Sequence, residues 1–274
     1  MRRWRIVGIG LALLLAAGDA RAQQAASRSP VFDLLDRTLV TPAELRALLA
    51  RGAPLEAPGG PQRVTPLLKA IDRAGGPMHD NSDLALVRIL IAAGARVDPS
   101  AGGDAPLCLA IQGRRAEDIV ILLLRAGADP NVTCNGDTPL DRAVLYHSVD
   151  IAAMLLEAGA RLPSIAGKIN ASPLLTKATR DGAARMVALL LRHGAAVDER
   201  GVGGSTALME ARTVDAAKVL IAHRADVHAR DGSGRSVLAI HVAERHDRIA
   251  ALLRSHGARE ESSPLPPAGA PPRQ

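Results

Sequence analysis

Aromatic residues are almost absent from this sequence, which contains one Trp, one Tyr and one Phe among its 274 residues. The Trp is residue 4, inside a basic and apolar N-terminal segment, so the rest of the chain holds only Phe32 and Tyr146. Proteins that bind single-stranded nucleic acid stack successive bases on aromatic side chains, and sugar binding uses a similar stacking. A chain with two aromatic side chains is poorly supplied for either task.

Long apolar runs are also rare, and the longest one lies at the N-terminus. After three arginines comes an apolar stretch over residues 6–17, followed by an A-x-A cleavage site at residues 20–22. This layout predicts a signal peptide over residues 1–22 and a periplasmic or secreted mature protein. The alternative is a membrane anchor, but a span requires about 20 apolar residues. We therefore expect no membrane association after cleavage.

A strong excess of positive charge is missing too. The 34 basic and 28 acidic residues give a net charge of +6, and the basic residues are scattered along the chain. Loss of the signal peptide removes four arginines and one aspartate, which leaves a net charge of +3. Domains that bind nucleic acid carry a basic patch or stripe on one face. A balance this mild does not demand one, so no nucleic-acid partner is expected.

Recognisable catalytic and metal-binding motifs are missing as well. The chain lacks the G-x-S-x-G elbow of hydrolases. Gly167-Lys168 resembles the end of a phosphate-binding loop, but Ile169 follows where that loop has Ser or Thr. The eight histidines show no zinc-ligand spacing such as H-E-x-x-H. We expect no enzymatic activity, no catalytic residue, no bound metal and no cofactor.

The sequence does contain an internal repeat. A Gly-Ala step ends an apolar run at six places, and Arg224-Ala225 occupies a seventh, with spacings of 42, 33, 32, 35, 30 and 33 residues. A second landmark, a [Thr/Ser]-Pro-Leu start or a variant of it, recurs in phase with the first. The glycines are Gly52, Gly94, Gly127, Gly159, Gly194 and Gly257, and the starts lie at residues 65–67, 105–107, 138–140, 172–174, 206–208 and 236–238.

A period near 33 residues with a Thr-Pro-Leu start resembles the ankyrin repeat family. The resemblance covers residues 29–259 and implies an all-α solenoid of about seven helix-turn-helix units, with hairpin-like connecting turns. Thr before Pro-Leu predicts an N-cap with Pro in the first turn, and in one unit this gives helices over residues 139–146 and 149–156. A linker over residues 23–28 and a disordered Pro-rich tail over residues 260–274 flank the repeats. A polyproline ligand is the alternative for the tail.

The resemblance also implies a protein partner, bound by a monomer at a concave face made of turn tips and exposed first-helix positions. Within the family it admits a scaffold, an immunity-type inhibitor of a toxic enzyme, or an accessory such as a helper of an oxidative-stress enzyme. Tyr146 is the expected anchor, because Tyr is enriched in binding hot spots, and packing at the repeat edge is its alternative role. The predicted protein-binding residues are Asp104, Gln112, Asn135, Asp137, Tyr146, Arg180 and Arg235.

The sequence departs from the family at the His of the TPLH motif, which is absent from every unit. Asp141 and Cys108 are two of its replacements. In the family this position faces the following turn, and Cys134 lies in that turn, so the resemblance brings Cys108 within reach of Cys134. An exported protein meets the oxidising conditions that a disulfide requires. The alternative is that both cysteines remain thiols.

Repeat two carries an insertion over residues 71–83, which makes it longer than its counterparts. His79, Asp80 and Asp83 within it are potential metal ligands, and they supply the alternative from another functional class, a hydrolase or metal-binding protein. Two other interpretations are a solvated loop, with Asn81 or Ser82 capping a helix that begins near Asp83, and a loop that contacts a partner.

Overall fold

The structure, a computed structural model, describes residues 29–57, 64–76, 81–98, 105–113, 115–162 and 173–259. The predicted signal peptide, linker and Pro-rich tail lie outside these residues. The chain divides into two compact units, residues 1–136 and residues 137–274, which we call unit one and unit two and describe separately.

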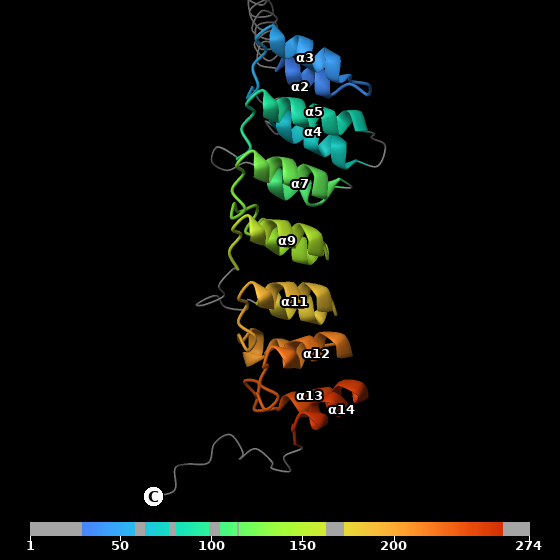
Figure 1. The fold of residues 1–274 in the computed structure, drawn as a ribbon, viewed down its shortest axis with the longest axis vertical. Helices are drawn as coiled ribbons and strands as arrows, with labels where there is room; N and C mark the ends of the chain where they lie inside the picture. Colours follow the sequence, from blue (N-terminus) through green and yellow to red (C-terminus); the bar gives the residue numbers. More distant parts are fainter. Residues whose placement is uncertain are drawn as a thin grey trace, which may run out of the picture. The chain divides into compact units, whose positions relative to one another are not determined.

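The described part of unit one consists of consecutive helix pairs, coloured blue to green in Figure 1. The first helices α2, α4 and α6 contact one another in series, and so do the second helices α3, α5 and α7, which gives two layers. Leu67, Leu107 and Leu123 are buried between them. The helices are α2 (Pro30–Leu35), α3 (Pro42–Ala50), α4 (Pro66–Gly75), α5 (Asn81–Ala92), α6 (Pro106–Ala110) and α7 (Ala116–Arg125).

Unit two repeats this arrangement in the part coloured green to red in Figure 1. Its first layer runs α8, α10, η2 and α13, and its second layer runs α9, α11, α12 and α14, with Leu140, Leu155 and Leu220 buried. The elements are α8 (Pro139–Leu145), α9 (Val149–Glu157), α10 (Leu174–Arg180), α11 (Ala184–Arg192), η1 (Val202–Gly204), η2 (Ala207–Glu210), α12 (Val214–Ala222), α13 (Val237–Ala243) and α14 (Asp247–Ser255).

The described residues contain 13 α-helices and no strand, which confirms the predicted all-α fold of helix-turn-helix repeats. Each layer alone would leave its apolar side in water, and each repeat buries that side against its neighbours. Among the described residues, none of the helices combines the length and the apolar character needed to cross a bilayer.

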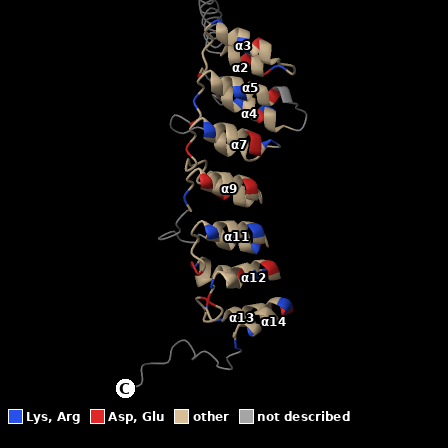
Figure 2. Cartoon of the chain, viewed as in Figure 1, with Lys and Arg blue, Asp and Glu red and all other residues tan. Residues whose placement is uncertain are grey.

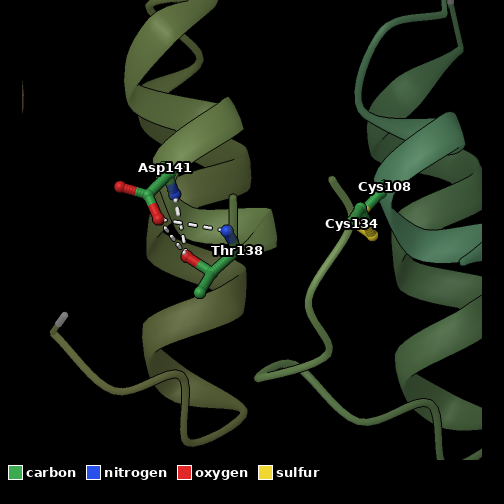
Figure 3. Close-up of a disulfide and its surroundings, with 4 residues drawn as sticks. All are labelled: Cys108, Cys134, Thr138 and Asp141. Atoms are coloured by element: carbon green, nitrogen blue, oxygen red, sulfur yellow. Dashed lines mark hydrogen bonds between the residues drawn. A yellow bond between two sulfur atoms is a disulfide. The ribbon is translucent and has the colours of Figure 1, made fainter. Parts of the chain in front are cut away.

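Helix α8 begins as predicted, at a Thr cap followed by Pro. The Thr138 hydroxyl accepts a hydrogen bond from the Asp141 N–H at 3.2 Å, and the Asp141 carboxylate accepts one from the Thr138 N–H at 3.0 Å (Figure 3). This reciprocal pair is a capping box, which satisfies two backbone donors at the helix start. Asp141 occupies the position of the missing TPLH histidine, so in this repeat a local cap takes the place of that side chain.

The residue that ends each second helix has a left-handed backbone. Gly127 and Gly159 have φ of +89° and +93°, a region where a residue without Cβ avoids strain. Arg224 occupies the same position with φ of +64°, at a cost of about 1 kcal/mol. The same repeat has a first helix shortened to the four-residue 3₁₀ segment η2. The shorter sequence of this repeat is accommodated by a shorter first helix, and η2 still contacts α10 and α13 of the neighbouring repeats.

Candidate functional site

Unit two exposes apolar side chains where its first helices end. Leu145 and Tyr146, at the end of α8, are 63% and 47% exposed, and Val242 of α13 is 43% exposed. Tyr146 is the C-cap of α8, and His147 follows with φ of +55°, which reverses the chain toward α9. We call the surface formed by the C-terminal ends of α8, α10, η2 and α13, with the turn residues that follow them, the first-helix face.

Ion pairs connect consecutive repeats along the first helices of unit two, and the His147–Asp181 and Arg180–Glu210 pairs lie on the first-helix face, whereas Asp141 lies at the start of α8. Each pair is partly exposed, so each contributes only about 0–1 kcal/mol to stability, and the His147 pair is ionic only when its imidazole is protonated. Their main effect is to give the surface beside Leu145 and Tyr146 a defined pattern of charge. The pairs are Lys177–Asp141 (3.9 Å), His147–Asp181 (4.0 Å) and Arg180–Glu210 (3.2 Å).

Four of the predicted protein-binding residues lie in unit two. Tyr146 and Arg180 occupy the ends of α8 and α10, so both belong to the first-helix face. Asp137 and Arg235 are exposed and lie in the turns that precede α8 and α13. The structure therefore groups Tyr146 with Arg180 and assigns Asp137 and Arg235 to the turn tips.

The other three predicted residues belong to unit one. Gln112 follows the short helix α6 and is exposed. Asn135 lies in a turn, is exposed, and has φ of +55°, a left-handed conformation that Asn tolerates better than most residues. Asp104 lies outside the described residues. Among the described residues of repeat three, which contains α6 and α7, no large apolar side chain is exposed. Gln112 and Asn135 therefore lie on a polar surface.

Arg235 is held by an aspartate of its own turn. Asp231 accepts hydrogen bonds from the Ser233 and Arg235 N–H groups at 2.9 Å, and its carboxylate pairs with the Arg235 guanidinium at 2.8 Å. Burial raises the pKa of Asp231, but the hydrogen bonds from Arg235 and Ser233 outweigh it, so the pKa lies below its ordinary value. The pairing fixes the shape of this turn tip, a role that the sequence did not suggest for Arg235.

The cysteines of unit one form a disulfide between Cys108 of α6 and Cys134 of the turn after α7 (Figure 3). Their Cα atoms lie 6.5 Å apart, and both residues are buried beside Ala105 and Val132. Cys108 occupies the TPLH histidine position. In this repeat a covalent bond therefore joins that position to the following turn.

Asp83 of the repeat-two insertion forms an ion pair with Arg73. Asp83 lies in α5, which begins at Asn81, two residues earlier than predicted. Its carboxylate accepts a hydrogen bond from Arg73 Nε at 3.0 Å, and both side chains are nearly buried. His79 and Asp80 lie outside the described residues. Because Asp83 joins α4 to α5, it does not support the metal-binding interpretation of this insertion.

The turn between α13 and α14 gathers two imidazoles and a carboxylate. His241 Nδ1 lies 3.1 Å from His246 Nδ1, which lies 3.4 Å from Glu244 Oε2. His241 is fully buried, and its Nε2 lies 2.9 Å from the carbonyl oxygen of Leu208 in η2. Burial lowers the pKa of His241, which favours the neutral imidazole. The ligand atoms of the three side chains all lie within 4.8 Å of one another.

Sequence spacing did not reveal this cluster. Its residues are three and two positions apart and cross the end of α13, whereas H-E-x-x-H places its two histidines on one face of a continuous helix. The repeat pattern carries a weak signal for it, because His241 and His246 stand at positions where the α8 and α10 repeats have Ala or Ser.

Charge is mixed on the helices of both units. Figure 2 shows basic and acidic residues together on α7 in unit one, and α14 in unit two carries Asp247 in its first turn and Arg254 in its last. This pattern differs from the one-sided basic stripe of nucleic-acid-binding domains. The surface of each unit is therefore mostly polar, with a few exposed apolar residues.

Comparisons with known proteins identify a matching family model and a relative. The family model described as "Ankyrin repeats (3 copies)" matches residues 78–166. A protein of Treponema pallidum (strain Nichols), named as ankyrin repeat-containing, is 34% identical over 123 residues. The match covers 42% of this chain and 39% of that protein, so the chain spans about two fifths of the length of the relative.

The matched segment and the described helix pairs around it share the same construction. A Thr or Ser side chain caps the first helices α4, α8 and α13, whereas Ala105 and Pro173 precede α6 and α10 without a side-chain cap. A left-handed residue ends each second helix, and a turn leads to the next pair. Residues 78–166 therefore contain ankyrin repeats, and the chain resembles a protein-binding module built from them.

Proposed function

We propose that this chain is an exported protein-binding module, periplasmic or secreted, that acts as scaffold, inhibitor or accessory of another exported protein. Ankyrin repeats generally mediate protein–protein interaction. The N-terminal segment has the layout of a signal peptide, and a buried disulfide suits an oxidising compartment.

One observation supports the location of the binding surface. Leu145 and Tyr146 are neighbouring large apolar residues that are both exposed at the end of α8, and the next residue, His147, lies 4.0 Å from the Asp181 carboxylate on the first-helix face. Interfaces commonly combine an aromatic anchor with a polar surround that excludes water. We therefore propose that the partner docks on the first-helix face of unit two, with Tyr146 as its anchor.

The Tyr146→Ala substitution tests this surface. We expect it to weaken partner binding by about 2 kcal/mol, or about 30-fold, because a hot-spot Tyr loses most of its contact area. Its effect on folding is expected to be small, since the side chain is about half exposed. The partner is first identified by pull-down from a periplasmic extract with mass spectrometry, and its affinity is then measured by calorimetry.

Val202→Ala is the matched control, because Val202 is 49% exposed but lies in η1, away from the first-helix ends. A partner that binds the wild type, the Val202 variant and the Tyr146 variant equally well would place the interface elsewhere. The identity of the partner also separates the inhibitor from the accessory role.

Export has its own test. We expect the mature chain to be recovered from the periplasm or the medium with Gln23 as its first residue, because the A-x-A site ends at Ala22. Cell fractionation and intact-mass measurement read this directly. A cytosolic chain that retains residues 1–22 would contradict the proposed compartment and leave the docking surface to be tested separately.

A further inference from the structure

Repeat seven, made of α13 and α14, differs from the α8 and α10 repeats at two structurally equivalent positions. In the repeats of α8, α10 and α13 one backbone hydrogen bond closes the turn after the first helix. It joins Ser148 N to Ala143 O at 2.9 Å, Ala183 N to Ala178 O at 3.1 Å, and His246 N to His241 O at 2.9 Å. Two small residues therefore flank this bond in the first two repeats, and two histidines flank it in repeat seven.

The orientation of the His241 ring follows from its partners. Its Nε2 lies 2.9 Å from the Leu208 carbonyl oxygen, which can only accept a hydrogen bond. Nε2 therefore carries the proton, and Nδ1 presents its lone pair toward His246. A histidine whose second nitrogen donates to a backbone carbonyl has the arrangement that orients metal-ligating imidazoles in proteins.

Two of the separations between the ligand atoms match those of a single bound ion, and all three lie within 4.8 Å. A tetrahedral zinc site with bonds of about 2.0–2.1 Å places its ligand atoms about 3.3 Å apart. The Nδ1 atoms of His241 and His246 lie 3.1 Å apart, and Glu244 Oε2 lies 3.4 Å from His246 Nδ1. Small rotations of Glu244, which is exposed, would complete the set.

We propose that His241, Glu244 and His246 bind a divalent transition-metal ion of the zinc class at the turn between α13 and α14. Imidazole nitrogen with one carboxylate suits Zn²⁺, Cu²⁺ and Ni²⁺, whereas Ca²⁺ and Mg²⁺ prefer oxygen ligands throughout. Without the ion, the His246 Nδ1–H group donates to His241 Nδ1. The ion takes the place of this hydrogen, and His246 adopts its other tautomer, with the proton on Nε2.

The arrangement has a structural consequence for the last repeat. Arg245 has φ of +58°, a strained conformation for a residue with Cβ, and it lies between two of the ligands. An ion held by His241, Glu244 and His246 would clamp this turn. With three protein ligands, a four-coordinate ion would also keep one position for water, which can reach the site because Glu244 is exposed.

Zinc titration of the purified, oxidised chain tests the proposal. The chain is produced without a histidine tag, and binding is followed by calorimetry and by the shift in melting temperature. We expect one Zn²⁺ per chain and a melting temperature that rises with Zn²⁺ concentration, with no response to Ca²⁺ or Mg²⁺. The neighbouring repeats supply the variants, because His241→Ala and His246→Ser restore residues that unit two already uses at these positions. Both variants are expected to fold and to lose the site.

Glu244→Gln is a second variant that does not disturb packing, since the side chain is exposed, and we expect it to weaken Zn²⁺ binding by about tenfold or more. His223→Ala and His79→Ala are the controls and are expected to bind Zn²⁺ as the wild type does. Absence of Zn²⁺ binding in the wild type would overturn the proposal. So would unchanged binding in His241→Ala and His246→Ser, or an equal loss of binding in either control variant.

Discussion

Replacing Arg73 with Met is expected to lower the free energy of unfolding by about 3–5 kcal/mol, because it removes one partner of a buried ion pair. The Arg73 guanidinium donates to Asp83 Oδ1 at 3.0 Å, and both side chains are nearly buried. Met keeps the apolar stem but removes every donor. The Asp83 carboxylate then loses its cationic partner in a site that water reaches poorly.

Arg73 also satisfies backbone carbonyls of the preceding repeat, which adds to the expected loss. Nη1 donates to the carbonyl oxygens of Leu35 and Arg37 at 3.1 and 2.6 Å, and Nη2 donates to that of Thr38 at 3.4 Å. The planar fork of Arg reaches several acceptors at once, and a Lys ammonium does not reproduce its geometry. Arg73→Lys is therefore expected to recover only part of the stability.

Hydrogen exchange of the α2 to α5 amides, together with denaturant unfolding, measures this effect. Arg88→Met is the matched control, since Arg88 of α5 is exposed, and its effect is expected to stay within about 0.5 kcal/mol. If the Arg73 and Arg88 variants lost the same small amount, the network around Arg73 would not be holding the two repeats together.

Reduction of the Cys108–Cys134 disulfide is expected to lower the free energy of unfolding by about 3.5 kcal/mol in the chain-entropy model. The bond joins residues 26 positions apart, and breaking it releases the unfolded chain from a loop of that length. Denaturant unfolding with and without reductant measures the difference, and exchange of the α6 and α7 amides locates it in repeat three.

The Cys108→Ala/Cys134→Ala double variant separates the bond from the reductant. It is expected to match the reduced wild type closely and to show no response to reductant. A thiol titration of the denatured, unreduced chain should detect no thiol. Two titratable thiols would show that the bond does not form, and would also weaken the case for an oxidising compartment.

Features that depend on residues close together in the chain, such as helix caps and turns, were predictable from the sequence. The start of α8 depends on Thr138, Pro139 and Asp141, which lie within four residues of one another, and its observed end at Leu145 is one residue from the prediction. The turn after each second helix requires a left-handed residue, and Gly127 supplies one without strain because it has no Cβ. Because such features recur from repeat to repeat, the helix-turn-helix architecture could be predicted from the sequence.

Contacts between repeats were not predictable in the same way. Arg180 was singled out as an exposed binding residue, but Glu210, thirty residues later, pairs with it. Arg235 was assigned to recognition and proved also to brace its own turn through Asp231. In each case the sequence showed that the residue is charged. Which residue it pairs with depended on which side chains the folded structure brings within reach.

The sequence by itself determined the approximate positions of the helices, which residues are apolar enough to be buried, and the period at which these features recur, because caps, turns and helical faces depend on neighbouring residues. Only the tertiary structure decided that Arg73 binds Asp83 and the carbonyls of an earlier repeat, and that His241, Glu244 and His246 converge. Hydrogen bonds act over about 3 Å, so side chains distant in the chain interact only once the packing of the repeats has placed them together.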